Sequence, residues 1–501
     1  MEALDLLMVG MESLMTPSRI GFMLLGVILG LLVGVLPGVG GTTGVAILLP
    51  ISVYLEPISA LTMLAGIYWG AMYGGLITSI LFAVPGNPWS VAVMFDGRPL
   101  ALQGKAGLAM AVGFCVSFIG AIVASILFTF FAQPFAEVAL RFGPPEMFAI
   151  LMLAFGTFIG MGGSPWKAFI MIAAGFLLAA VGIDPVTGQP RFTFGSIALL
   201  QGFHFVPITI GLFGVGEVLS NAADRYKLQI EEMTKAAKLG MQDIFGGLHA
   251  VWNAKWLALG SALLGFVTGV LPGAGATPGS FIAYGVARRV SHTPEKFGTG
   301  HVEGVVAPEA ANNAAGTAAI LPMLVLGIPG SPTAAIMMAG VFMWGFIPGP
   351  TLFTEEPEFV WGFIASLYLA NLAAVVICLT STPVLAAILR TPYAIIAPVI
   401  IVFCFVGSYA IQNSMLDIWY TLIFGVLGFV FRRLEFPLAP LVIALVLGFP
   451  TEQALRQSLI MSDASLMVFF SSGIGAAVMS VAILLFLLPV IQMIWRRVRA
   501  R

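Results

Sequence analysis

Long apolar stretches alternate with short polar ones along almost the whole chain. A helix needs ~20 apolar residues to cross the hydrocarbon core of a bilayer, and stretches near that length recur from about residue 20 to residue 494. The pattern predicts an all-α polytopic membrane protein with about 12 to 15 crossings and no large soluble domain. The predicted helices are 20–36, 42–55, 58–84, 106–131, 147–161, 167–183, 197–217, 256–271, 277–290, 305–328, 333–347, 359–389, 394–410, 416–431, 435–449 and 466–494.

A polar stretch divides this pattern into two halves. Residues 221–255 hold the densest run of charged side chains before the C-terminus. We therefore expect a first transmembrane repeat over 1–220, a cytoplasmic or interfacial linker over 221–255, and a second transmembrane repeat over 256–501.

Two motifs occur in both halves and in the same order. Residues 34–44 and 269–279 are identical at eight of eleven positions, and Val-Pro-Gly-Asn-Pro at 84–88 is echoed by Ile-Pro-Gly-Ser-Pro at 328–332. Each motif interrupts an apolar stretch with proline and glycine. Backbone of this kind is tolerated at membrane depth only where it is buried in protein or lines a cavity, and its occurrence in both halves points to the binding site of a transporter.

Charge indicates how each half faces, because short cytoplasmic loops are enriched in Lys and Arg. Equivalent loops of the two halves carry opposite charge, which predicts two inverted-topology repeats. Arg19 and Arg191 fall on the non-cytoplasmic side in this scheme. The loops that carry the bias contain Glu56 against Arg288, Arg289 and Lys296, and Arg98 and Lys105 against Glu355, Glu356 and Glu358.

Composition supports the membrane assignment. Hydrophobic residues make up 59% of the 501 and charged residues 9%, and the mean hydropathy is +1.03. The net charge of −1 gives no sign of a nucleic-acid partner. The four histidines are scattered and no catalytic constellation stands out, so we expect neither an enzyme nor a cofactor, and the sequence defines no metal site.

The first motif is predicted to end one helix and begin another in each half. A helix N-terminus carries partial positive charge and free N–H groups, which together bind an anion such as a carboxylate. The alternative is a kink that lets helices pack closely. The candidate substrate-binding residues here are Gly38, Gly40, Gly41, Thr42 and Thr43 in the first half and Gly273, Gly275 and Thr277 in the second.

The second motif is predicted to form a re-entrant hairpin tip, because two closely spaced prolines forbid continuous helix. An ordinary loop between two spans, with Trp89 at an interface, is the alternative. Backbone near Gly38, Gly86, Gly273 and Gly330 could also hold a cation. The tip residues predicted to bind substrate are Gly86, Asn87, Gly330, Ser331 and Thr333.

Glu309, Asn312 and Asn313 share one face of a predicted helix. Such groups at membrane depth usually mark an ion or substrate path, so Asn312 and Asn313 join the substrate-binding candidates. The alternative for Glu309 is an acid at a helix N-terminus after Pro308. Tyr68 and Trp69 occupy the equivalent positions of the first half.

These segments resemble the large membrane subunit of tripartite tricarboxylate transporters, the TctA family. The resemblance covers nearly the whole chain and rests on the paired Val-Leu-Pro-Gly motifs at 35–38 and 270–273, the segments 96–100 and 104–107, and the segment 307–313. The residues that match the family's motifs are Gly38, Gly40, Asn87, Gly273, Asn312, Asn313 and Ser331. Trp89 departs from the smaller residue expected after the tip proline.

The resemblance implies a multi-pass protein of the bacterial inner membrane that acts as a cation symporter for organic anions such as tricarboxylates or dicarboxylates. It implies a small TctB-like membrane subunit, a periplasmic TctC-like solute-binding protein and a coupling cation, Na⁺ or H⁺. A homodimer in the lipid bilayer is one option. From the residues alone, a passive anion channel is the alternative, and an integral-membrane enzyme lacks its catalytic groups.

Overall fold

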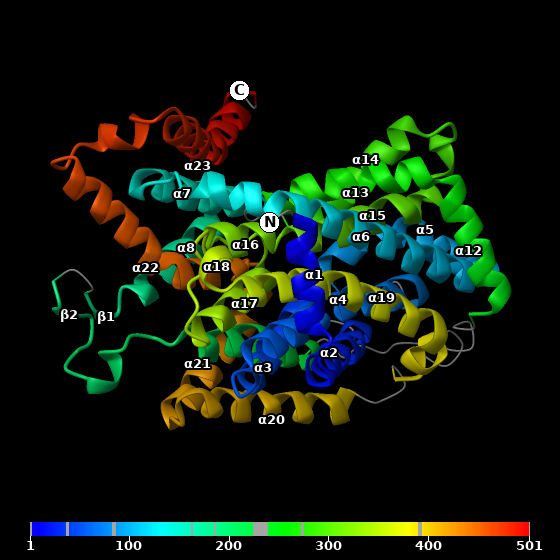
Figure 1. Cartoon of the computed structure of the whole chain (residues 1–501), viewed down its shortest axis with the longest axis horizontal. Helices are drawn as coiled ribbons and strands as arrows, with labels where there is room; N and C mark the ends of the chain where they lie inside the picture. The colour runs from blue at the N-terminus through cyan, green and yellow to red at the C-terminus, as the bar shows by residue number, and fades with distance from the viewer. Residues whose placement is uncertain are drawn as a thin grey trace.

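Helices built from the predicted apolar stretches make up most of the computed structural model (Figure 1). The structure describes residues 3–36, 40–82, 87–161, 164–184, 187–223, 239–271, 275–388 and 393–499. Several helices begin at a proline, which suits the first helical turn because its N–H would have no partner there. The described elements of the first half are α1 (Ala3–Leu14), α2 (Pro17–Val35), α3 (Gly40–Ser52), α4 (Pro57–Phe82), η1 (Pro88–Ser90), α5 (Val91–Leu100), η2 (Ala101–Lys105), α6 (Ala106–Ala139), α7 (Pro144–Met161), α8 (Pro165–Ala179), β1 (Gly182–Ile183), β2 (Pro190–Arg191), η3 (Ile197–Leu199), α9 (Phe205–Thr209), η4 (Ile210–Val215) and α10 (Gly216–Ala223).

The second half repeats much of this order. Strands β1 and β2, both in the first half, pair antiparallel and form the one sheet among the described elements. The described elements of the second half are α12 (Met241–Asn253), α13 (Lys255–Val270), α14 (Ala276–Val290), η5 (Pro294–Lys296), α15 (Glu303–Ala318), α16 (Leu321–Leu326), α17 (Pro332–Met343), α18 (Leu352–Glu355), α19 (Pro357–Ile388), α20 (Tyr393–Gln412), α21 (Met415–Arg433), α22 (Leu438–Met461), η6 (Leu466–Phe470) and α23 (Gly473–Arg499).

Seven of the described helices are long and apolar enough to cross a membrane, or eight if the pair α12 and α13, bent by 76°, forms one span. Six shorter apolar helices accompany them, among them α3 and α17. The all-helical polytopic fold is therefore confirmed, whereas the number of crossings stays a prediction. Of these short helices, α3 and α17 begin at the proline–glycine motifs, as expected for broken spans.

Contacts in one half have counterparts in the other. Helix α2 packs along α4, and α13 packs along α15. Helix α4 also contacts α19 of the second half, while α15 contacts α6 of the first, and α1 lies on α19 as α12 lies on α6. Each half thus lends one long helix, α6 or α19, to the other half. This exchange fits a duplicated fold, and the inverted orientation stays a prediction.

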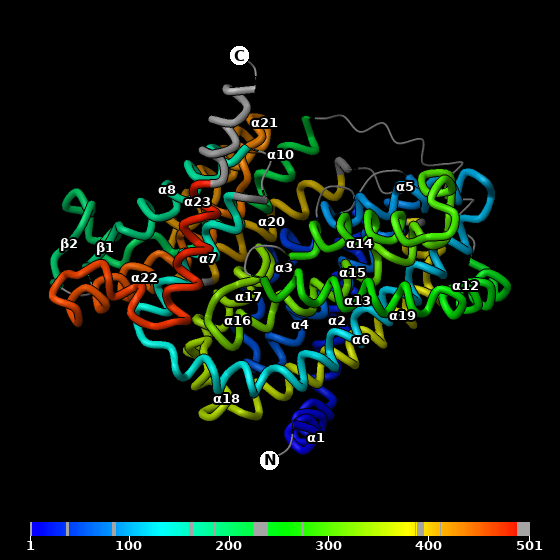
Figure 2. Tube along the Cα trace, turned by 90° about the horizontal axis from the view of Figure 1, so that it is seen from above, coloured from blue at the N-terminus to red at the C-terminus, as the bar shows by residue number. Residues whose placement is uncertain are grey.

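Acidic and basic helix ends lie toward opposite edges of the molecule. Figure 2 shows α1 and α18 at one edge of the molecule and α5, α10 and α21 toward the opposite edge. Helix α18 ends in acidic residues, whereas the C-terminal turns of α5 and α21 are basic. The separation agrees with the opposite charge bias of the loops.

Several predicted segments differ from the observed ones. The span predicted at 305–328 is divided between α15, which ends at Ala318, and α16, which begins at Leu321. The span predicted at 197–217 begins as an α-helix only at Phe205, because a short 3₁₀ turn over Ile197–Leu199 ends before Gly202, whose positive φ interrupts the chain. Helix α22 continues to Met461, where an ion pair between Glu452 and Arg456 at i,i+4 spacing supports its polar end.

The polar segment that follows the first tip was predicted as a loop, but it is helical. Helix α5 runs to Leu100 and continues through a π turn to α6. Gly104, with φ of +80°, provides the bend between α5 and α6.

Candidate functional site

The glycines that begin the second helix of the first motif have the same backbone conformation in both copies. Gly40 has φ of +65° and Gly275 has φ of +63°, a region that favours glycine. Gly40 directly begins α3, and Gly275 caps α14. The repeated glycine therefore sets the angle at which each broken helix starts, and the first turns of α3 and α14 begin at equivalent points.

In the first half, the side chain of Asn87 connects α3 to α4. Its Oδ1 accepts a hydrogen bond from the Gly41 amide at 2.8 Å, and its Nδ2 donates to the Ala71 carbonyl oxygen at 3.2 Å. Asn87 is 4% exposed. The tip residue thus lies against the first turn of the broken helix, as the sequence predicts for a shared site.

In the second half, Gly275 lies beside Ser331 and Gly330. The Gly330 amide donates to the Ala319 carbonyl oxygen at 3.1 Å, which ties the tip to the end of α15. Ser331 caps α17 by accepting a hydrogen bond from the Ala334 amide at 3.1 Å. The turn from Gly327 to Ser331 between α16 and α17 is the predicted hairpin tip.

A hydroxyl pair joins the two halves. Thr42 Oγ1 of α3 and Thr333 Oγ1 of α17 are 2.8 Å apart, and η1 of the first tip packs on α14. The Thr43 hydroxyl donates to the Phe213 carbonyl oxygen at 3.1 Å. Two helix N-termini and two tip segments therefore meet at one place, which we call the junction: residues 40–43, 87–90, 275–280 and 327–333.

Most of the predicted substrate-binding residues lie at this junction. Thr277 belongs to the first turn of α14 and its carbonyl oxygen accepts a hydrogen bond from Ser280. Gly38, Gly86 and Gly273 lie outside the described residues, so their part in a substrate or cation site stays a prediction.

Aromatic side chains close one side of the junction, and sequence reasoning did not assign them to the site. Trp89 packs edge-on against Tyr68 with ring centroids 6.0 Å apart. The Tyr68 hydroxyl lies beside Ser331, but the two do not form a hydrogen bond. Trp69 Nε1 donates to Thr317 Oγ1 at 3.3 Å. One feature of the sequence could have identified Tyr68 and Trp69: they occupy the positions of the first half that are equivalent to Asn312 and Asn313 in the second.

Electrostatics at the junction come from backbone rather than from ionised side chains. None of the hydrogen bonds described above involves Lys or Arg. The N-terminal ends of α3 and α14 supply partial positive charge. This arrangement suits an anionic ligand that must leave again, because it attracts negative charge without forming a fixed ion pair.

Glu309, Asn312 and Asn313 form a second polar group on α15. All three are 0–1% exposed. Helix α15 begins at Glu303 and contains Pro308, so the alternative of Glu309 as an N-terminal acid at an interface is wrong. The structure places Asn312 and Asn313 with Glu309 rather than with the tip residues, and their part in substrate binding stays a prediction.

Asp96 fastens the first tip helix to the second half. Its Oδ1 accepts hydrogen bonds from the amides of Gly298, Gly300 and His301 at 2.8–2.9 Å, and its Oδ2 accepts from the Tyr284 hydroxyl at 2.9 Å. The carboxylate is fully buried and satisfied. It therefore holds α5 against the loop before α15.

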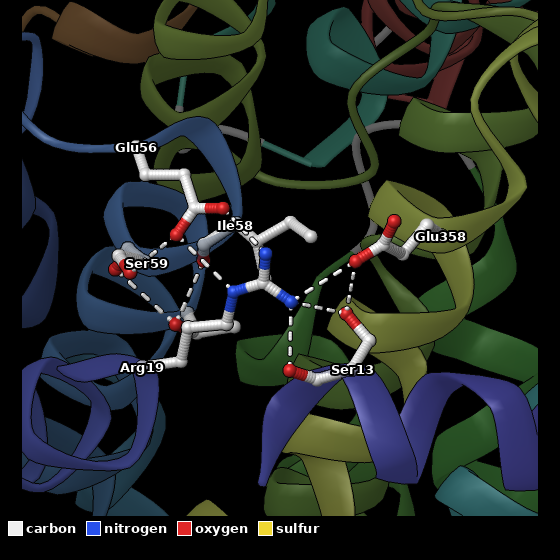
Figure 3. A network of polar contacts seen from close by, with 7 residues as sticks. Ser13, Arg19, Glu56, Ile58, Ser59 and Glu358 are labelled. Atoms are coloured by element: carbon white, nitrogen blue, oxygen red, sulfur yellow. Dashed lines mark hydrogen bonds and ion pairs between the residues drawn. The ribbon is translucent and has the colours of Figure 1, made fainter. Parts of the chain in front are cut away.

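The two arginines that fell on the non-cytoplasmic side of the predicted topology are both paired. Figure 3 shows the Arg19 guanidinium between Glu56 and Glu358, with Ser13 beside it. The hydrogen bond from Arg19 lowers the pKa of Glu56. Arg191 pairs with Glu452 at 2.7 Å and Asp184 at 3.2 Å. Their charges are compensated locally, which weakens them as topology signals.

A cavity of about 760 Å³ reaches the second tip. Leu326 and Gly327 form part of its lining, together with the polar residues Arg191, Gln201 and Gln453. Within the described ranges, no group of three or more His, Cys, Asp or Glu side chains is placed to hold a metal ion.

Comparison with known proteins agrees with this architecture. Residues 20–443 match the family model described as "Tripartite tricarboxylate transporter TctA family". The chain is 38% identical to an "Uncharacterized 52.8 kDa protein in TAR-I ttuC' 3'region" of Agrobacterium vitis, with 98% of each chain covered. It is 37% identical to an "Uncharacterized protein in TAR-II ttuC' 3'region" of the same organism, over 46% of this chain and 96% of the relative. No solved structure matches. This multi-pass membrane protein therefore belongs to the tripartite tricarboxylate transporter TctA family.

Proposed function

We propose that the chain is the large membrane subunit of a cation-coupled symporter that imports organic carboxylates such as dicarboxylates or tricarboxylates. A periplasmic TctC-like solute-binding protein delivers the substrate, a small TctB-like membrane subunit completes the complex, and the bacterial inner membrane is its location. Family membership supports a transporter component, and the finer statements are argued from the junction.

The observation that carries the proposal is the meeting of two broken-helix N-termini with two hairpin tips. Such a junction offers backbone N–H groups to an anion from two sides. A di- or tricarboxylate has carboxylate groups several bonds apart, so it can engage α3 with one carboxylate and α14 with another. Asn87, Ser331 and Thr333 add side-chain groups around the same place.

Alternating access follows from where the two halves touch. The Thr42–Thr333 hydroxyl contact lies between α3 and α17, and separation of these helices opens the junction on one side. In inverted repeats, the equivalent movement between α14 and η1 opens it on the other. The cavity that Gly327 helps to line supports an approach to the second tip past the middle of α22.

Transport assays distinguish this mechanism from a passive anion channel. The chain, its small subunit and its binding protein are reconstituted in vesicles, and uptake of labelled carboxylates is measured with and without a Na⁺ or pH gradient. We expect accumulation above equilibrium with a gradient, and counterflow when the vesicles are preloaded with unlabelled substrate. Equilibration without counterflow would identify a channel, because only a carrier exchanges substrate through one alternating site.

A further inference from the structure

Helix α15 carries a buried carboxyl group that has no positively charged partner among the described residues. Glu309 is 1% exposed and none of the described ion pairs includes it. Ser117 of α6 donates to its Oε2 at 3.1 Å, and Asn313 Nδ2 contacts the same oxygen at 3.4 Å. Its other oxygen, Oε1, has no hydrogen-bond partner.

Several neighbouring polar atoms are also without a partner. They are Asn312 Oδ1 and Nδ2, Asn313 Oδ1 and the hydroxyl of Tyr73. All of these side chains are fully buried. Buried polar atoms in native proteins nearly always have a hydrogen-bond partner, so a cluster of such atoms without partners needs an explanation. An unpaired buried carboxylate is costlier still, because the charge has lost its hydration.

The other titratable groups around the cluster do not neutralise it. Cys115 of α6, Cys378 of α19 and Glu309 all lie within electrostatic range of Tyr73 of α4, and neither cysteine carries positive charge. Asp96 of α5 faces Gly304, more than one helical turn away, and its oxygens are already bonded. The missing partner must therefore bring positive charge from outside.

We propose that Glu309, Asn312, Asn313 and Tyr73 form the binding site of the monovalent cation that is transported together with the carboxylate. The proposal deepens the symport function and rests on it. Carboxylate, amide and hydroxyl oxygens are hard ligands suited to a hard cation. One carboxylate is neutralised by one monovalent cation, either Na⁺ or a proton, whereas a divalent ion would leave a buried positive charge.

The same helix connects this cluster to the substrate junction. One turn beyond Asn313, Thr317 accepts the hydrogen bond of Trp69, and the Ala319 carbonyl accepts that of Gly330 in the second tip. Ten residues of helix separate Glu309 from Ala319, a rise of about 15 Å. The cation is therefore bound close enough to bias the end of α15, and with it the tip, without touching the substrate.

The first half has no equivalent site. Ala65, Tyr68 and Trp69 of α4 stand where the second half has Glu309, Asn312 and Asn313. These side chains are buried, and Tyr68 and Trp69 belong to the aromatic side of the junction. The duplicated fold thus offers two helix ends for the anion but one site for the cation. We had expected Asn312 and Asn313 among the substrate ligands, and this proposal assigns them to the cation instead.

The test compares wild type with Glu309→Gln in reconstituted vesicles that contain the complete transporter. Accumulation is driven in one arm by a Na⁺ gradient at constant pH and in the other by a pH gradient without Na⁺. We expect Glu309→Gln to lose accumulation by at least about tenfold in the arm that drives wild type, while counterflow persists, because coupling and substrate binding are separate. The arm that drives wild type identifies the cation. Wild-type accumulation in Glu309→Gln would overturn the proposal.

If Glu309→Gln fails to insert into the membrane, a milder pair of variants tests whether Glu309 binds the cation. Ser117 and Ser125 are both fully buried on α6, but Ser117 donates to Glu309 whereas Ser125 donates to the Ala121 carbonyl of its own helix. We expect Ser117→Ala to move the half-saturating cation concentration by at least about threefold and Ser125→Ala to leave it unchanged. Equal behaviour of the two variants would overturn the proposal.

Failure of the symport function itself has a different signature. Wild type would then show neither gradient-driven accumulation nor counterflow. If wild type accumulates and all three variants match it, transport is coupled but Glu309 does not bind the cation.

Discussion

The two halves of the molecule share their backbone but differ in chemistry. Gly40 and Gly275 begin α3 and α14 with nearly the same φ, and Asn87 and Ser331 precede the tip helices in the same extended conformation. Yet Asn87 bridges two helices whereas Ser331 caps only its own. The comparison agrees with our proposal that the backbone features present twice bind the anion, and that side chains present once serve the cation.

The helix pairs beneath the two junctions show the same relation. In the first half, glycines of α2 and α4 face each other, and an added Cβ at Gly30 would lie 2.2 Å from the Ile67 carbonyl oxygen. In the second half, glycines of α13 face alanines of α15, and an added Cβ at Gly269 would lie 2.3 Å from the Ala315 carbonyl oxygen. Small residues let both pairs approach closely.

The largest effect is expected from substitutions that disrupt this close packing. We predict that Gly30→Ala and Gly269→Ala each destabilise the fold by about 3 kcal/mol, because the new methyl group meets backbone that cannot move away. Thermal unfolding in detergent measures the loss. Gly21→Ala on α2 and Gly260→Ala on α13 are matched controls with nothing within 4 Å of the new atom, and they should melt as wild type does. A tolerated Gly269→Ala would show that the halves are packed differently.

The next largest effect is a difference in carboxylate affinity between variants of the two tips. Asn87→Ala removes two buried hydrogen bonds, each worth about 1 kcal/mol, and should weaken carboxylate affinity about thirtyfold. Ser331→Ala removes one local cap and should weaken it about fivefold. Substrate binding to the purified complex, measured by calorimetry, gives both values. The reverse order would contradict the unequal roles assigned to the tips.

A smaller effect is expected at the aromatic link between the halves. Trp69→Phe keeps the ring packing but removes the donor to Thr317, at a cost of about 1 kcal/mol. We expect apparent cation affinity to change more than substrate affinity, because Thr317 lies between the Glu309 cluster and the second tip. Equal changes in both affinities would argue against a path along α15.

The smallest effect is a pH dependence at the edge of the molecule. Because Arg19 lowers the pKa of Glu56 in the folded state, the pair stabilises the protein above the ordinary glutamate pKa of 4.5 and loses this contribution as the pH falls below that value. Glu56 is about half exposed, so the contribution is at most about 1 kcal/mol. Wild type should melt above Glu56→Gln at pH 7 and with it near pH 3.5. A difference that persists at the lower pH would contradict this account.

The sequence predicts the fold well where local rules decide it. The starts of α2, α4, α8 and α17 lie within a few residues of the predicted ones, because apolar length and proline position are local features. The loop before α9 is longer than predicted, since the apolar residues from Ile197 to Leu200 continue the hydropathy pattern although α9 begins only after Gly202, whose φ is positive.

The site was predictable in its parts but not in its arrangement. Glycine and proline in duplicate identify the broken helices, and the structure then brings Thr42 next to Thr333 across 291 residues of sequence. No local pattern states that Asn87 bonds Gly41 or that Ser117 faces Glu309, because the first contact depends on how the tip returns to α3 and the second on how α6 packs against α15 of the other half.

The most direct test of the central claim uses the seam between the halves. Cysteines at both Thr42 and Thr333, whose hydroxyl oxygens are 2.8 Å apart, are placed to form a disulfide, and the three native cysteines are buried. The measurement is the rate of disulfide formation in Thr42→Cys/Thr333→Cys with and without saturating carboxylate. If the substrate binds at the junction, it slows the reaction, and the completed disulfide stops transport until a reductant is added. An unchanged rate together with undiminished transport by the oxidised protein would contradict the account.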